Sequence, residues 1–109
     1  MGKLALTPEV LALIADRFKA LAEPARLHIL QCLRGGELSV GELVEETGFG
    51  QANVSKHLQQ LHTFGFVRRR KEGLFVYYAI SDRSVFQLCD VMCGQLAAST
   101  EARRKLLAM

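Results

Sequence analysis

The 109-residue sequence has no tryptophan, only two prolines and only three cysteines. A small and odd number of cysteines argues against the disulfide framework of small secreted domains and favours reduced thiols in a cytosol. No apolar run approaches the roughly 20 residues that a membrane-spanning helix needs, and the first ten residues lack a secretory-signal pattern. Large enzymes, membrane proteins and disulfide scaffolds are therefore disfavoured, and we expect a single domain over residues 1–109 with no membrane partner.

Half of the residues are hydrophobic, which is enough for a buried core, and the formal net charge is +3. The positive charge is concentrated between residues 51 and 80, where five basic residues face one acid, while the other 79 residues sum to −1. Such a local excess is typical of a surface that binds phosphates. An ordinary solvated strand with surface charge is the alternative interpretation of this feature.

Two helices are predicted before residue 34. Residues 7–9 (Thr-Pro-Glu) have the types that begin a helix, because threonine caps, proline suits the first turn and an acid favours the positive end. Apolar residues then recur at helical spacing, which predicts a helix over residues 8–21. A second helix is predicted over residues 24–33, with Leu27 and Leu30 facing the core.

A helix-turn-helix is predicted over residues 39–64. Ser39 and Glu42 have the spacing of a capping box, and the short helix that they begin ends at Gly48. A longer helix follows from Gln51 to about residue 64. A helix of about 8 residues and a helix of about 14 residues, joined by a short glycine-containing turn, are typical of this motif.

The pattern changes after residue 65. Two segments rich in β-branched, aromatic and basic residues, 66–71 and 74–80, flank the tight-turn pair Glu72-Gly73, which predicts a hairpin over residues 66–80. A long helix over residues 82–107 completes the chain. The expected fold is mainly α with a β-hairpin wing: a winged helix-turn-helix with additional helices at both ends.

The second helix of a helix-turn-helix lies in the major groove of DNA, with residues near its start facing base edges. If Val54, Leu58 and Leu61 face the core, the opposite side of this helix is polar. Asparagine and glutamine pair with adenine, serine bonds several bases, and a lysine neutralises phosphate or contacts guanine. The candidate DNA-binding residues of this helix are Gln51, Ala52, Asn53, Ser55, Lys56, Gln59 and Gln60.

The hairpin contributes three further candidates. Arg68 and Arg70 point to one face of the strand, and Arg69 and Lys71 point to the other. Since both faces are charged, we expect both to be wet or to lie against phosphate. Arg68, Arg70 and Lys71 are therefore predicted to contact the DNA backbone or minor groove; a solvated β-ribbon is the alternative.

Five segments together carry a resemblance to a known family. They are FKALAEPARLHIL (residues 18–30), ELSVGEL (37–43), QANVSKHLQQL (51–61), FGFVRRRKEG (64–73) and VYYAIS (76–81). With these segments the chain resembles the ArsR/SmtB family of bacterial metal- and stress-responsive repressors over nearly its whole length.

The resemblance implies a winged-helix homodimer of the bacterial cytosol, in which the helices at about 8–33 and 82–107 contribute to the dimer interface. It also implies binding to double-stranded DNA at an imperfect palindromic operator, and release when an inducer binds. In one branch of the family two cysteines bind metal where this chain has Ser39 and Gly41, so that site is absent. A zinc-binding branch has Asp-x-His where this chain has Asp82 without the histidine. A redox-sensing branch pairs two cysteines, and Cys32 lies one residue from the position of the first.

The remaining candidates for an inducer site are the cysteines. Cys89 and Cys93 are four residues apart on a predicted helix, so their sulfurs lie on one face. Thiolates select thiophilic metal or metalloid ions, and Cys32 or a group from a partner chain would complete such a site. Redox or sulfur chemistry at the same thiols is equally compatible. Simple packing is the competing interpretation, because free cysteine behaves as a small hydrophobic residue.

The sequence thus predicts a DNA-binding transcriptional repressor. A winged helix that serves only as a protein-interaction module is the alternative, although the basic wing and the polar helix face argue against it. No enzyme is expected, because Ser55 and His57 do not face each other on a helix and no phosphate loop or carboxylate pair is present.

Overall fold

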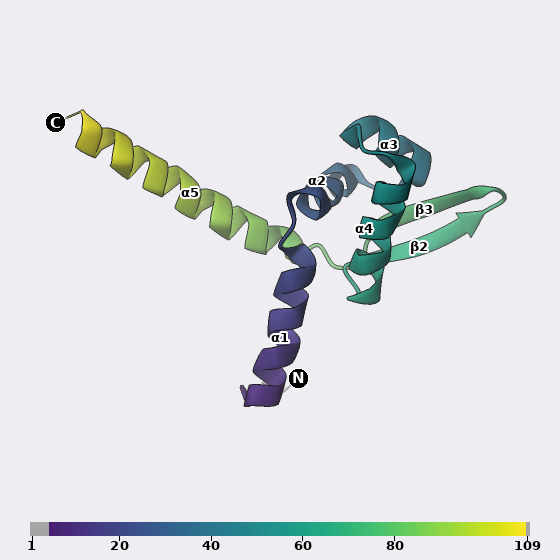
Figure 1. Ribbon diagram of the computed structural model, residues 1–109, viewed down its shortest axis with the longest axis horizontal. Helices are drawn as coiled ribbons and strands as arrows, with labels where there is room; N and C mark the ends of the chain where they lie inside the picture. The colour runs from purple at the N-terminus through teal and green to yellow at the C-terminus, as the bar shows by residue number, and fades with distance from the viewer. Residues whose placement is uncertain (1–4, 109) are drawn as a thin grey trace.

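The computed structural model, which describes residues 5–108, contains five α-helices and one small antiparallel sheet of three strands (Figure 1). The elements are α1 (Pro8–Leu21), α2 (Pro24–Cys32), a 3-10 turn (Leu33–Gly35), β1 (Leu38–Ser39), α3 (Val40–Thr47), α4 (Gln51–Thr63), β2 (Val67–Glu72), β3 (Phe75–Ile80) and α5 (Val85–Leu107). The sheet has the order β1-β3-β2, so β3 is its central strand.

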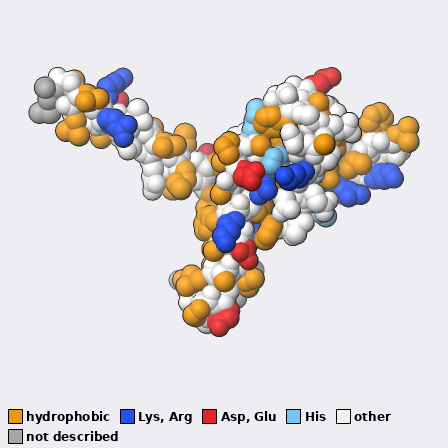
Figure 2. All heavy atoms as spheres, in the orientation of Figure 1, with side chains coloured by type: hydrophobic (Ala, Val, Ile, Leu, Met, Phe, Trp, Pro, Cys, Tyr) orange, Lys and Arg blue, Asp and Glu red, His pale blue; other side chains and the backbone are white. Residues whose placement is uncertain are grey.

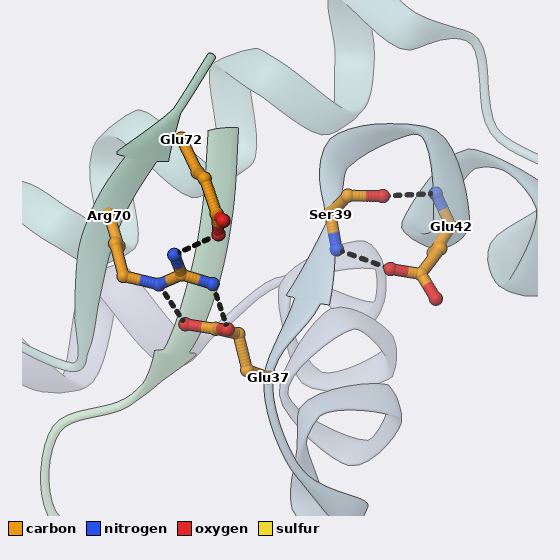
Figure 3. Close-up of polar contacts among 5 residues, drawn as sticks. All are labelled: Glu37, Ser39, Glu42, Arg70 and Glu72. Atoms are coloured by element: carbon orange, nitrogen blue, oxygen red, sulfur yellow. Dashed lines mark hydrogen bonds and ion pairs between the residues drawn. The ribbon is translucent and has the colours of Figure 1, made fainter. Parts of the chain in front are cut away.

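The predicted helix starts are confirmed where a side chain caps the backbone. The Thr7 hydroxyl accepts a hydrogen bond from the amide of Val10 at the start of α1. At α3 the Glu42 amide donates to Ser39 Oγ (3.1 Å) and the Ser39 amide donates to Glu42 Oε1 (2.9 Å), the reciprocal capping box (Figure 3). Gly48 then ends α3 with a φ of 75°, a left-handed conformation that glycine adopts without strain.

The hairpin turn lies one residue later than the sequence indicated. Glu72 pairs with Phe75 in the sheet, so the two turn residues are Gly73 and Leu74. Gly73 has a φ of 60°, which the first position of such a tight turn requires and which glycine supplies. The prediction of Glu72-Gly73 as the turn pair is therefore wrong by one residue, because Glu72 still belongs to the ladder.

Two other expectations also need correction, and one strand was not predicted. Helix α5 begins at Val85 rather than at residue 82, because the Asp82 carboxylate accepts from the Ser84 amide (2.9 Å) and holds a turn there. Leu27 is 38% exposed, since it lies about 200° around α2 from the fully buried Ile29. Strand β1, only two residues long, carried no strand pattern of its own.

The core lies between α2, α3, α4 and the sheet. Val54, Leu58 and Leu61 of α4 are all fully buried, as the sequence predicted. By contrast, α1 and α5 project from this body, and only their ends next to it are buried, Ala20 and Leu21 in α1 and Val85 and Phe86 in α5 (Figure 1). Within residues 5–108 no helix combines the length and the apolarity that crossing a bilayer demands.

Candidate nucleic-acid interface

Helix α4 presents a continuous polar side to solvent. Because its three buried residues recur every three or four positions, they occupy one side of the helix and leave the opposite side exposed. All of the predicted DNA-binding residues of this helix are exposed, namely Gln51, Ala52, Asn53, Ser55, Lys56, Gln59 and Gln60. The first turn has no side-chain cap, since Gly50 stands at the cap position, so its first amides have no side-chain acceptor.

A polar cluster joins α4 to the corner between α1 and α2. His57 of α4 is largely buried, and its Nδ1 accepts a hydrogen bond from Arg26 Nε (3.2 Å). The Glu23 carboxylate lies 3.7 Å from both His57 Nδ1 and Arg26 Nη2, and Arg26 Nη1 donates to the Ala20 carbonyl (3.2 Å). These contacts connect α4 to two other helices, and they give His57 a packing role through Arg26 and Glu23, which the sequence did not single out.

The hairpin of β2 and β3 extends from the body and carries basic side chains along its length (Figure 2). From Arg68 to Glu72 every residue of β2 is exposed, which confirms that both faces of this strand are wet. Val67 alone is buried in the strand, opposite Ile80. The wing is therefore packed into the core at its base, and β3 also pairs with β1 at Tyr77 and Tyr78.

Arg70 differs from its basic neighbours because it is engaged within the chain. Its Nε and Nη2 donate to the two oxygens of Glu37 (3.1 and 2.7 Å), and its Nη1 pairs with Glu72 (Figure 3). The guanidinium lies 4.7 Å from the centre of the Tyr77 ring. The hydrogen bonds from Arg70 lower the pKa of Glu37, and those to Glu37 and Glu72 raise the pKa of Arg70. Arg70 thus links both hairpin strands to the segment before β1, so phosphate would have to compete with two carboxylates for it.

The three cysteines lie in different environments. Cys32 is half-buried in α2, and its burial, together with the charge of Glu46, raises the pKa of its thiol. Cys89 is half-buried and Cys93 is exposed on α5. Among residues 5–108, no three His, Cys, Asp or Glu side chains are close enough together to hold a metal ion.

Helices α1 and α5 expose large apolar side chains. Where the two helices approach, they line a hollow of about 420 Å³ together with the loop after α4, Gly65 and Phe66. The apolar faces of α1 and α5 are the exposed residues Leu11, Ile14 and Phe18 of α1 and Leu88, Val91, Met92 and Leu96 of α5. A contiguous apolar surface of this kind marks a contact with another molecule.

A family model described as bacterial regulatory protein, arsR family, matches residues 23–69. The chain is 39% identical over 85 residues to the probable mercury resistance operon repressor of Streptomyces lividans, a match that covers 78% of this chain and 66% of that protein. It is also 39% identical over 85 residues to the transcriptional regulator NmtR of Mycobacterium tuberculosis, of which the match covers 71%. The chain spans slightly less than two thirds of the length of two of these relatives: 66% of the mercury repressor and 64% of the regulator KmtR of Mycobacterium tuberculosis.

Two solved structures match over most of the chain. The crystal structure of Rv0081 from Mycobacterium tuberculosis has a TM-score of 0.79 at 34% identity, over 89% of this chain and 98% of that one. The solution structure of a homodimeric winged helix-turn-helix DNA-binding domain from Mycobacterium bovis, described as a possible ArsR-family regulator, has a TM-score of 0.72 at 33% identity. This second match covers 91% of this chain and 90% of that domain.

Proposed function

Because the chain belongs to the ArsR family of bacterial regulatory proteins, a non-enzymatic class, we propose that it is a transcriptional repressor that binds its operator as a homodimer. The observation that carries this proposal is the division of α4 into a fully buried apolar side and a fully exposed polar side. A helix so divided fits into the major groove while the body of the domain holds it from behind.

The basic wing supports the same assignment. Arg68, Arg69 and Lys71 are exposed on a hairpin that stands beside the body, and their charges favour the phosphate backbone. A protein-interaction module would need neither this basic hairpin nor the polar face of α4. The salt dependence of binding distinguishes the two functions. The affinity for DNA falls steeply as ionic strength rises, whereas a protein complex that depends little on charge keeps its affinity.

The homodimer is proposed from the apolar faces of α1 and α5. A twofold dimer that buries these faces presents two copies of α4, so the operator is expected to be an imperfect palindrome with half-sites about one helical turn apart. The similarity to a homodimeric domain from Mycobacterium bovis supports this arrangement.

Gln51→Ala and Ser55→Ala variants are expected to lose about 1–3 kcal/mol each in binding to the preferred duplex, and to discriminate less between sequences. Both side chains lie in the first turns of α4, where helix residues meet base edges. The measurement is a gel-shift titration with duplexes selected in vitro by the purified protein, and with variants of those duplexes. Gln31→Ala, an exposed glutamine on α2, is the matched control and should bind like the natural protein. Unchanged discrimination by both α4 variants would contradict the placement of this helix in the groove.

The inducer is proposed to act at Cys89 and Cys93. The two thiols lie one helical turn apart on the face of α5 that we assign to the dimer, with Cys93 exposed. A thiophilic ion held by these thiols and a group from the partner chain, or oxidation of the thiols, would alter that interface. The similarity to a protein named as a mercury resistance repressor supports the first kind of inducer.

A Cys89→Ser, Cys93→Ser double variant is expected to bind the selected duplex as tightly as the natural protein but to stay bound when an inducer is added. The measurement is release of the fluorescent duplex on addition of Hg²⁺, arsenite or hydrogen peroxide. Cys32→Ser is the control and should still respond, because burial disfavours the reactive thiolate at that position. A double variant that no longer folds or dimerises would instead support packing as the role of these cysteines.

A further inference from the structure

The tip of the wing is apolar, although the strand that leads to it is basic. Leu74 is 97% exposed and Phe75 is 62% exposed, at the end of the hairpin farthest from the body (Figures 1 and 2). A single exposed leucine needs no explanation in itself. Here, however, the exposed Phe75 follows it directly, so two neighbouring apolar side chains stand at the turn of the hairpin, whose first position, Gly73, is the one that needs glycine.

The tip is held away from the body by a stiffened hairpin. The ladder between β2 and β3 is continuous from Val67–Ile80 to Glu72–Phe75, so only Gly73 and Leu74 lie outside it. Arg70 ties β2 to Glu37 and covers the ring of Tyr77, whose centre lies 6.4 Å from that of Phe75. Leu74 stands at the end of this ladder with 97% of its surface exposed.

The charges beside the tip indicate its partner. Glu72, the acid nearest the tip, is paired with Arg70, while Lys71 and Arg69 are exposed on one face of β2 and Arg68 on the other. A partner that meets Leu74 therefore also lies close to exposed cations of the same strand. The minor groove of duplex DNA offers both features, since it is about 6 Å wide, strongly negative, and open to apolar side chains that wedge between stacked base pairs. A two-residue turn places the Leu74 side chain ahead of the paired strands, so this side chain can enter the groove without the strands.

We propose that Leu74, backed by Phe75, inserts into the minor groove next to each operator half-site and bends the DNA there. This inference rests on the proposed function and adds a mode of sequence recognition to it. Unstacking of base pairs is least costly at pyrimidine–purine steps such as TA and CA. The wing is therefore expected to favour operators with such a step beside the half-site, without any hydrogen bond to its bases.

The test compares Leu74→Ser with Leu74→Met. Both substitutions keep the turn and every charge of the wing, but only methionine keeps an apolar side chain able to enter the base stack. The probe is a duplex of about 30 base pairs, selected in vitro by the natural protein and labelled at both ends, so that energy transfer reports bending. We expect the natural protein and Leu74→Met to bend the duplex by about 20° or more. Leu74→Ser is expected to bend the duplex less and to bind it about tenfold more weakly, because a straighter duplex contacts less of the protein surface.

The salt dependence of duplex binding distinguishes loss of the Leu74 insertion from loss of all contacts of the wing with DNA. Leu74→Ser should keep the slope of log affinity against log salt, since its phosphate contacts remain. If Leu74→Ser bends and binds the duplex like the natural protein, the tip has another partner and the inference is overturned. If the natural protein selects no duplex at all, the proposed function fails and the inference fails with it.

Discussion

A Met92→Glu variant is expected to be monomeric in solution and to bind its operator about 100-fold or more weakly than the natural protein. Met92 is 62% exposed at the middle of the apolar face of α5, between Leu88 and Leu96. An unpaired carboxylate in a buried apolar contact costs several kcal/mol, so two symmetry-related copies should prevent association. The affinity falls because a dimer engages both half-sites and a monomer engages only one.

Sedimentation equilibrium reports the mass in solution, and a gel-shift titration reports the affinity. Gly94→Glu is the control, because it adds the same charge about 200° around the helix from Met92, at a position with no atoms nearby. We expect this control to remain dimeric and to bind DNA. A Met92→Glu variant that is still a dimer would show that the subunits associate through another surface.

A Leu58→Ala variant is expected to lose about 2–5 kcal/mol of unfolding free energy, a large fraction of the stability of a small domain. Leu58 is fully buried at the middle of α4 with Val54 and Leu61 on either side. Truncation leaves a cavity between α4 and the core, and the surrounding helices can close it only by moving the helix that carries the proposed DNA-binding face.

Urea unfolding of the purified protein measures this loss. Gln59→Ala, one residue along the same helix but exposed, should change the unfolding free energy by no more than about 0.5 kcal/mol. The same control should weaken operator binding, since Gln59 lies on the polar face. A loss below about 1 kcal/mol for Leu58→Ala would mean that the buried side of α4 contributes little to holding it.

The elements that depend on local signals were predictable from the sequence. The start of α1 follows from the Thr7 cap, and the start of α3 follows from Ser39 and Glu42, because these bonds join residues only three apart. The buried side of α4 follows from the spacing of Val54, Leu58 and Leu61 for the same reason. The exposed residues of its polar side were identified as the complement of that stripe.

Contacts between distant segments were not predictable in this way. Arg70 and Glu37 are 33 residues apart, and the sequence suggested only that Arg70 was one of four similar cations. His57 and Arg26 are 31 residues apart, and neither residue carries a signal that names the other. The strand β1 has two residues, too few for a periodic pattern, and exists because β3 offers it an edge.

The sequence by itself determined the winged helix-turn-helix, the buried and polar sides of α4 and the basic character of the wing, because each depends on the periodicity or type of neighbouring residues. Only the tertiary structure decided which of these residues remain available to a partner. It engaged Arg70 with two carboxylates, left Leu74 at the free end of the hairpin, and left the apolar faces of α1 and α5 uncovered. The physical reason is that exposure and ion pairing depend on every segment that folds nearby, whereas a helix or a turn depends mainly on its own few residues.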